Sequence, residues 1–301
     1  MLYGTLDQQE DLLEQARKYA EKTGIKLIFG AMVGSVSKGL HYADSDYDTR
    51  FLYLRKDFPD KICIPSEMKE EELVKRYYPK DKIYEWIPFW EATSFLQFLD
   101  NPSFKDDFSV GLYNIVGWTF QSPYIWDPYG LQSKIMPLIN TIFKKEYEIA
   151  YHRTIIQKYK SELEKEFVIV KSYLYSVHAA ATIEWCMRYN LQPPIDLQTL
   201  LCGLQREDIW CEAYSMLKEA RKKSREHFIY GESKLHSTHF DIMTSYNKKL
   251  TGYIKMIEKK SNLNIKKGEK DKENRVVLDN IYKIIYHSVF ESENLLFGNK
   301  A

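Results

Sequence analysis

The first hundred residues alternate between helical and extended patterns of apolar and polar positions. Residues 8–22 predict an amphipathic helix, because small and apolar side chains recur at helical spacing opposite a charged face. The side chains of that apolar face are Leu12, Leu13, Ala16 and Ala20. Three short apolar runs predict strands: 25–33, 47–55 and 82–89. This order favours a small mixed β-sheet with intervening helices, the third strand leading into a helix that begins near Glu91.

From about residue 141 the pattern becomes almost entirely helical. The predicted helical segments are 141–189, 207–226, 236–261 and 276–290. Residues 193–201, "PPIDLQTLL", predict a capped turn into a short helix, and the lysine-rich stretch 258–275 predicts a solvated loop. We therefore expect an α+β protein with a small mixed-sheet domain at 1–140 and a mainly α-helical C-terminal domain at 141–301.

Composition and charge limit the classes of function. The chain has 301 residues, 44% of them hydrophobic and 28% charged, which is typical of a folded globular protein. The net charge of +1 provides no overall attraction to nucleic acid or membrane. The run "RKKSR" at 221–225 and the lysines at 259–272 are expected to form solvated faces, with binding of RNA phosphates as the alternative.

Several other signals are absent or weak. The four cysteines form no C-x-x-C pair, and no apolar run approaches the length of a membrane span, so free thiols, no membrane partner and a cytoplasmic location are expected. His236, His239 and Asp241 have a metal-like spacing, but no cysteine or further histidine lies close by, so zinc is not expected. There is no G-x-S-x-G elbow and no P-loop, which argues against a serine hydrolase and a P-loop NTPase.

The stretch "MVGSVSKGLHYADSDYDTRFLYL" carries the most specific chemistry. Asp46 and Asp48 alternate at the mouth of a predicted strand, so both carboxylates would point to one face. Two adjacent like charges are unfavourable unless a cation neutralises them, and carboxylate oxygens suit Mg²⁺ or Mn²⁺. Gly34 and Ser35 follow a predicted strand and can offer N–H groups and a hydroxyl to a phosphate. The combination predicts phosphoryl or nucleotidyl transfer, whereas each part alone also fits a turn or a solvated cap.

A resemblance to a known family supports this interpretation. Gly34-Ser35, ten intervening residues and then Asp46-Tyr47-Asp48 resemble the signature of the DNA polymerase β-like nucleotidyltransferase superfamily. The longer string "GSVSKGLHYADSDYDTRFLYL" resembles one branch of it, the predicted nucleotidyltransferases related to RlaP and YcgL proteins. A second stretch at 171–201, "KSYLYSVHAAATIEWCMRYNLQPPIDLQTLL", is also similar to that branch. The resemblance covers both halves of the chain and is weak over 56–80 and after 230.

The resemblance implies a set of site residues and substrates. Asp46 and Asp48 would bind Mg²⁺, and a third carboxylate would come from a later strand, with Glu85 preferred over Glu91 and Asp81. The residues that would contact the nucleotide are Gly34, Ser35, Lys38, Ser45, Lys171 and Tyr175. The substrate would be a nucleoside triphosphate, expected to be ATP. The resemblance leaves the acceptor open between an RNA end, a protein and a small molecule, and the oligomeric state open as well.

Three positions depart from the pattern of the branch. Met32 stands where the branch has Glu, and Val36 and His178 stand where it has Arg. Lys38 would replace one lost charge, although a lysine does not reproduce the fork of a guanidinium. These departures leave two alternatives to an active transferase: a nucleotide-binding regulator or antitoxin-like module without transfer activity, and an interaction protein whose helical half is the working surface.

Overall fold

The computed structural model divides the chain into two compact units. It describes residues 5–42, 45, 48–55, 89–92, 95–96, 117–163, 165–230, 243–245, 247–261 and 272–297. The first unit comprises residues 1–34, 48–143 and 267–301, and the second comprises 35–47 and 144–266. Each unit therefore combines segments from distant parts of the chain. The expected domain boundary between residues 140 and 141 stays a prediction.

The described residues of the first unit form a four-stranded mixed sheet in the order β3-β2-β1-β4. Strand β1 (Ile25–Met32) pairs antiparallel with β2 (Thr49–Arg55) on one side and with β4 (Ile125–Trp126) on the other. Strand β3 (Phe89–Glu91) adds a parallel edge to β2. The α+β class and the small mixed sheet are thus confirmed.

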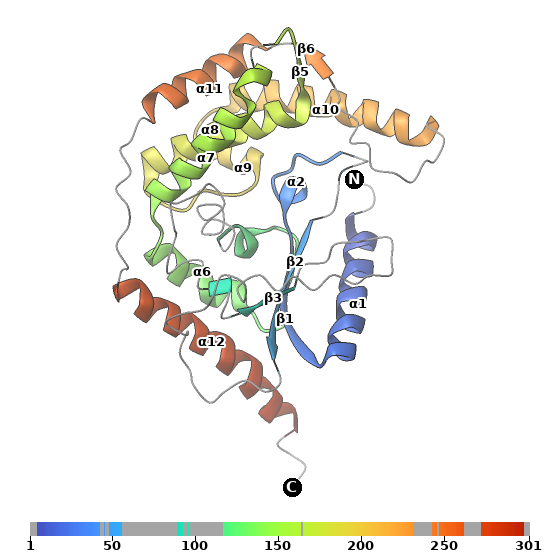
Figure 1. Cartoon of the computed structure of the whole chain (residues 1–301), viewed down its shortest axis with the longest axis vertical. Helices are drawn as coiled ribbons and strands as arrows, with labels where there is room; N and C mark the ends of the chain where they lie inside the picture. Colours follow the sequence, from blue (N-terminus) through green and yellow to red (C-terminus); the bar gives the residue numbers. More distant parts are fainter. Residues whose placement is uncertain are drawn as a thin grey trace. The chain divides into compact units, whose positions relative to one another are not determined.

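Helix α1 (Thr5–Thr23) packs against β1, as Figure 1 shows. Leu12, Ala16 and Ala20 are buried, because residues four apart lie on one face of a helix. The last six residues of β1 are all buried, which a strand covered on both faces requires, since its side chains alternate between faces. The predicted helix at 8–22 and the predicted strands at 25–33 and 47–55 are confirmed to within two or three residues.

The third predicted strand is only partly described. Residues 82–88, and with them Glu85, lie outside the described part of the chain, while Phe89 belongs to β3. The prediction that a helix begins near Glu91 is wrong by one residue, since Glu91 ends β3 and helical residues begin at Ala92. Glu91 pairs in parallel register with Tyr53 of β2, and this pairing extends the strand beyond the point that local pattern indicates.

Two further helices of the first unit pack against each other. Helix α6 (Leu131–Thr141) packs against α12 (Lys272–Phe297). The Asp127 carboxylate accepts hydrogen bonds from the amides of Leu131 and Gln132, at 2.7 and 2.8 Å, and so satisfies the first turn of α6. Helix α12 begins before the predicted residue 276, so residues 272–275 are helical rather than part of the expected loop.

The second unit is built around α8 (Val170–Tyr189). This helix contacts four others: α7 (Lys145–Leu163), α9 (Leu197–Gly203), α10 (Glu207–Tyr230) and α11 (Lys248–Lys260). Residues 176–184 of α8 are buried without interruption, as expected of a helix that is covered on all sides. The mainly α-helical character of the C-terminal region is confirmed. Asp196 caps α9, as predicted, by accepting a hydrogen bond from the Thr199 amide at 2.8 Å.

A short two-stranded sheet corrects two helix predictions. Strands β5 (Phe167–Ile169) and β6 (Met243–Ser245) pair antiparallel. They interrupt the segments 141–189 and 236–261, which were expected to be helical throughout. Because the two strands come from distant parts of the chain, a periodicity taken over a short window contains no signal for their pairing.

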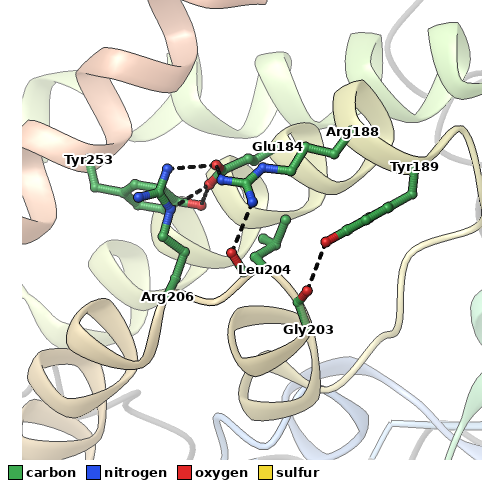
Figure 2. Close-up of polar contacts among 7 residues, drawn as sticks. All are labelled: Glu184, Arg188, Tyr189, Gly203, Leu204, Arg206 and Tyr253. Carbon is green, nitrogen blue, oxygen red and sulfur yellow. Dashed lines mark hydrogen bonds and ion pairs between the residues drawn. The ribbon is translucent and has the colours of Figure 1, made fainter.

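The buried carboxylate of Glu184 links α8, the residue before α10 and α11 in the second unit. Figure 2 shows Glu184 of α8 accepting hydrogen bonds from Arg188, from Arg206 before α10 and from the Tyr253 hydroxyl of α11. The Arg206 and Tyr253 contacts measure 2.7 and 2.8 Å. Burial alone raises the pKa of Glu184, but these three donors outweigh it and lower the pKa overall. Glu184 is therefore ionised at neutral pH.

Two expectations concern the chemistry of the whole chain. The cysteines that the structure describes, Cys186, Cys202 and Cys211, are free thiols. Burial raises the pKa of the Cys186 thiol, so Cys186 is protonated at neutral pH. Across the described ranges, no helix combines the length and apolarity needed to cross a membrane.

Candidate functional site

The predicted phosphate-binding glycine and one predicted metal ligand meet in the first unit. The Val33 amide donates a hydrogen bond to the Asp48 carbonyl at 2.8 Å, which joins the end of β1 to the start of β2. Gly34 has φ +66°, and a Cβ at this position would lie 2.0 Å from Asp48 Oδ2. The Asp48 carboxylate therefore rests against the Gly34 backbone, and only glycine allows both the left-handed conformation and this approach.

Asp48 is the one predicted metal ligand that lies within the described residues. The residue is exposed, and carboxylate oxygens are ligands that Mg²⁺ prefers. Asp46, Glu85 and Asp81 lie outside the described residues, as do His236, His239 and Asp241. Within the described part of the chain, no three His, Cys, Asp or Glu side chains gather in a way that could hold a metal ion. The three-carboxylate site stays a prediction.

Positions 32 and 36, where the chain departs from the branch pattern, hold buried apolar side chains. Met32 and Val36 are each 1% exposed. The Met32 amide donates to the Tyr124 carbonyl at 2.9 Å, and its carbonyl accepts from the Ser122 hydroxyl, so both of its backbone groups are paired within the first unit. These two positions therefore contribute apolar packing in this chain, where the branch pattern would place charges.

The loop after Gly34 is held by hydrogen bonds between its own residues. Helix α2 (Gly34–Ser37) is followed by a turn in which the Leu40 amide donates to the Ser35 carbonyl at 2.8 Å. Ser35 is buried at 3% exposure. The Ser45 hydroxyl accepts a hydrogen bond from the Tyr42 amide at 2.8 Å, which leaves its own proton to donate. The predicted phosphate contacts of Ser35 and Ser45 are not tested by these bonds.

Two residues predicted to contact the nucleotide lie together in the second unit. Lys38 is only 7% exposed, and its ammonium lies 5.6 Å from the centroid of the Tyr175 ring on α8. This distance is typical of a cation–π contact. Lys171 precedes Tyr175 by one helical turn, so both belong to the same face of α8. The structure thus joins the first sequence motif to the helix that carries the second.

Two neutral histidines lie close to Lys38. The rings of His152 on α7 and His178 on α8 have centroids 6.0 Å apart. His178 Nε2–H donates to the Ile195 carbonyl at 2.8 Å, and His152 Nδ1–H donates to the Glu148 carbonyl at 2.9 Å. Because carbonyls only accept, these bonds fix the tautomer of each ring.

The positive charge in this cluster therefore comes from Lys38. Burial lowers the pKa of His152 to about 3 and that of His178 well below its ordinary value, and the Lys38 charge adds to both effects. Both rings are neutral at pH 7. The Glu148 carboxylate lies 3.9 Å from His152 Nδ1, which is too far for a hydrogen bond and, beside a neutral ring, is not an ion pair. Position 178, an arginine in the branch pattern, carries no charge here.

Arg221 holds this loop, and Asp196 lies against it. Arg221 of α10 donates from Nε to the His41 carbonyl and from Nη2 to the Gly39 carbonyl, each at 3.0 Å. A Cβ on Gly39, whose φ is +71°, would lie 2.7 Å from Oδ2 of Asp196. Arg221 was expected on a solvated basic face, and that expectation is wrong for this residue. The run "RKKSR" contains no signal that separates Arg221 from its exposed neighbours.

Comparison with known proteins provides one distant relative. Over 218 residues, 71% of this chain and 77% of the relative, the chain is 21% identical to the uncharacterized protein YcgL of Bacillus subtilis (strain 168). No family model and no solved structure matches the chain. The similarity to YcgL is therefore confirmed at a low level of identity.

Proposed function

We propose that this protein is a Mg²⁺-dependent nucleotidyltransferase. It moves a nucleoside monophosphate from a nucleoside triphosphate, expected to be ATP, to a hydroxyl group of an acceptor and releases pyrophosphate. The observation that carries the proposal is the contact between Gly34 and Asp48, which brings the two ends of the sequence motif together. The similarity to YcgL adds a relative but no activity.

The first support is the donor chemistry at the start of β2. The exposed residue Asp48 offers a carboxylate whose hard oxygen atoms suit Mg²⁺, and this carboxylate lies against the backbone of Gly34. Asp46 and Glu85 are proposed as the other carboxylate ligands. Mg²⁺ would neutralise phosphate charge and orient the reacting groups when bound.

The second support is the buried positive charge of the loop. We propose that Lys38 contacts the triphosphate and that Lys171 and Tyr175 contact a phosphate and the base. Because His178 is neutral, Lys38 is the cation of this cluster, and its burial strengthens its interaction with an anion. A lysine acts as a point charge, so it would attract phosphate without the bidentate geometry of an arginine.

The proposed reaction is an in-line displacement at the α-phosphorus. The acceptor hydroxyl oxygen forms a bond to this phosphorus, and the bond from phosphorus to the pyrophosphate oxygen breaks. One of the proposed carboxylates takes the acceptor proton, which increases the nucleophilicity of the hydroxyl. The described residues would hold the phosphates and the carboxylate in place, which lowers the entropic part of the activation free energy.

A second candidate function is a nucleotide-binding regulator without transfer activity. The observation in its favour is that three positions with ionisable residues in the branch pattern are uncharged here: Met32 and Val36 are buried in apolar cores, and His178 is neutral. Such a protein would bind a nucleoside triphosphate and release no pyrophosphate.

Thermal unfolding with each nucleoside triphosphate, with and without Mg²⁺, tests the proposal. One nucleotide should raise the melting temperature only when Mg²⁺ is present, and Asp46→Ala with Asp48→Ala should abolish the increase. The control removes the same two charges from exposed positions of α1, as Glu10→Ala with Glu21→Ala, and should retain it.

Pyrophosphate release separates the two functions. Stabilisation together with pyrophosphate release that depends on both aspartates supports the transferase, although the assay must include candidate acceptors. Stabilisation without release across RNA ends, proteins and small molecules supports the regulator. If no nucleotide stabilises the protein, both functions fail, and capture of a partner that survives loss of both aspartates would favour an interaction protein.

A further inference from the structure

We infer that Arg221 is a positioning residue of the nucleotide site: it holds the loop that carries Lys38 in the conformation that binds phosphate. This inference rests on the proposed function, since it assigns Arg221 to the same site. Arg221 lies on α10, far from the motif in the sequence, and it donates hydrogen bonds to two backbone carbonyls of this loop.

Three backbone donors of the loop are satisfied within it. The amides of Gly39 and Leu40 donate to the carbonyls of Val36 and Ser35, at 3.0 and 2.8 Å. The Tyr42 amide donates to the Ser45 hydroxyl. These bonds close the turn, but they do not attach it to the rest of the second unit.

The carbonyls of the loop provide that attachment. The Lys38 carbonyl accepts from the Leu197 amide at the start of α9, at 3.1 Å. The Gly39 and His41 carbonyls both accept from Arg221. Buried backbone acceptors must be paired, so loss of Arg221 leaves two carbonyls without these donors. The loop is then held at Lys38 but released at Gly39 and His41.

The guanidinium group is suited to this contact in a way that a lysine is not. Arg221 reaches two carbonyls two residues apart with two N–H groups of one plane, each at 3.0 Å. A lysine keeps the positive charge but places its donors at a single point. A substitution by lysine therefore separates positioning from simple attraction between Arg221 and an anionic nucleotide.

The test compares dissociation constants by titration calorimetry, using the Mg²⁺ complex of the nucleoside triphosphate that stabilises the wild type most. Arg221→Ala and Arg221→Lys should each weaken binding by about tenfold or more. Arg206→Ala is the matched control, because it removes another partly buried guanidinium from the second unit, at the network of Figure 2. This control should lower the urea midpoint of unfolding and leave the dissociation constant unchanged.

Each outcome decides the inference. If Arg221→Lys binds the nucleotide as tightly as the wild type, the positioning role is overturned. The same follows if Arg206→Ala loses affinity in proportion to its loss of stability. If Arg221→Ala does not fold, Arg221→Lys decides alone. A wild type that binds no nucleotide overturns the proposed function and this inference together, whereas a wild type that binds while both Arg221 variants bind equally well overturns the inference alone.

Discussion

At Gly34 the absence of a side chain determines where a carboxylate can lie. The Asp48 Oδ2 atom occupies the space that a Cβ would fill, and the backbone at Gly34 is left-handed. Both constraints act on one residue, so a substitution combines backbone strain with a direct clash. Gly39 has the same combination with Asp196 in the second unit.

Gly34→Ala is expected to abolish the Mg²⁺-dependent stabilisation by nucleotide and to destabilise the fold. The matched control is Gly130→Ala, because Gly130 also has a positive φ, but its Cβ would lie 4.0 Å from the nearest atom, Ser133 Oγ. The control should cost about 1 kcal/mol of unfolding free energy through backbone strain alone. Equal losses of stability and unchanged nucleotide binding in both variants would contradict the proposed role of Gly34.

His152 should make stability depend on pH. Its pKa falls from the ordinary 6.5 to about 3 in the fold, mainly because it is buried. Between these values the unfolded chain binds a proton that the folded protein does not, so the free energy of unfolding decreases as pH falls below 6.5. The slope for one proton is at most about 1.4 kcal/mol per pH unit. His152→Gln should reduce the slope of the unfolding free energy against pH, measured by urea unfolding between pH 6.5 and 4. An unchanged slope would show that His152 does not titrate in this way.

At the scale of elements, α8 and α9, which contain the second sequence motif, contact the loop of the first motif. Tyr175 of α8 contacts the Lys38 ammonium, and the Leu197 amide of α9 donates to the Lys38 carbonyl. His178 donates to the Ile195 carbonyl and so attaches α8 to the segment that leads into α9. The stretch 171–201 therefore forms the support for the loop of the first motif.

Tyr253→Phe should destabilise the packing of α11 on α8. The Tyr253 hydroxyl donates to the buried Glu184 carboxylate at 2.8 Å, and a hydrogen bond to a charged group contributes about 1.5–3 kcal/mol. We expect a lower urea midpoint with an unchanged m-value. Tyr214→Phe on α10 is the control, because this tyrosine is 45% exposed, and its midpoint should match the wild type. A Tyr253→Phe midpoint equal to that of the control would show that the bond adds no net stability.

At the scale of the whole molecule, the size of a nucleotide effect can be estimated. A ligand at 100 times its dissociation constant adds about 2.7 kcal/mol to the free energy of unfolding. For 301 residues, unfolding entropies of about 2.1 cal/mol/K per residue then predict an increase in Tm of roughly 4 °C. Scanning calorimetry over a nucleotide series measures this increase. A shift that does not grow with the logarithm of nucleotide concentration would exclude binding at a single specific site as its cause.

Much of the local architecture follows from the sequence alone. Some features depend only on residues within a few positions of one another: the apolar face of α1, the apolar runs of β1 and β2 and the Asp196 cap of α9. Such signals can be seen in a short window, so the α+β class and the mainly helical C-terminal region could be predicted. The expected metal ligands could be named in the same way, although Asp46 and Glu85 lie outside the described residues.

Only the tertiary structure decided the contacts that join distant segments. The pairing of β5 with β6, the hydrogen bonds from Arg221 to the Lys38 loop and the contact between Lys38 and Tyr175 all link residues far apart in the chain. The same run of basic residues contains the partly buried Arg221 and the exposed Lys222 and Lys223. Periodicity and capping report the energetics of neighbouring residues. Which distant carbonyl or ring a side chain meets depends on how the elements pack, and that depends on the whole chain at once.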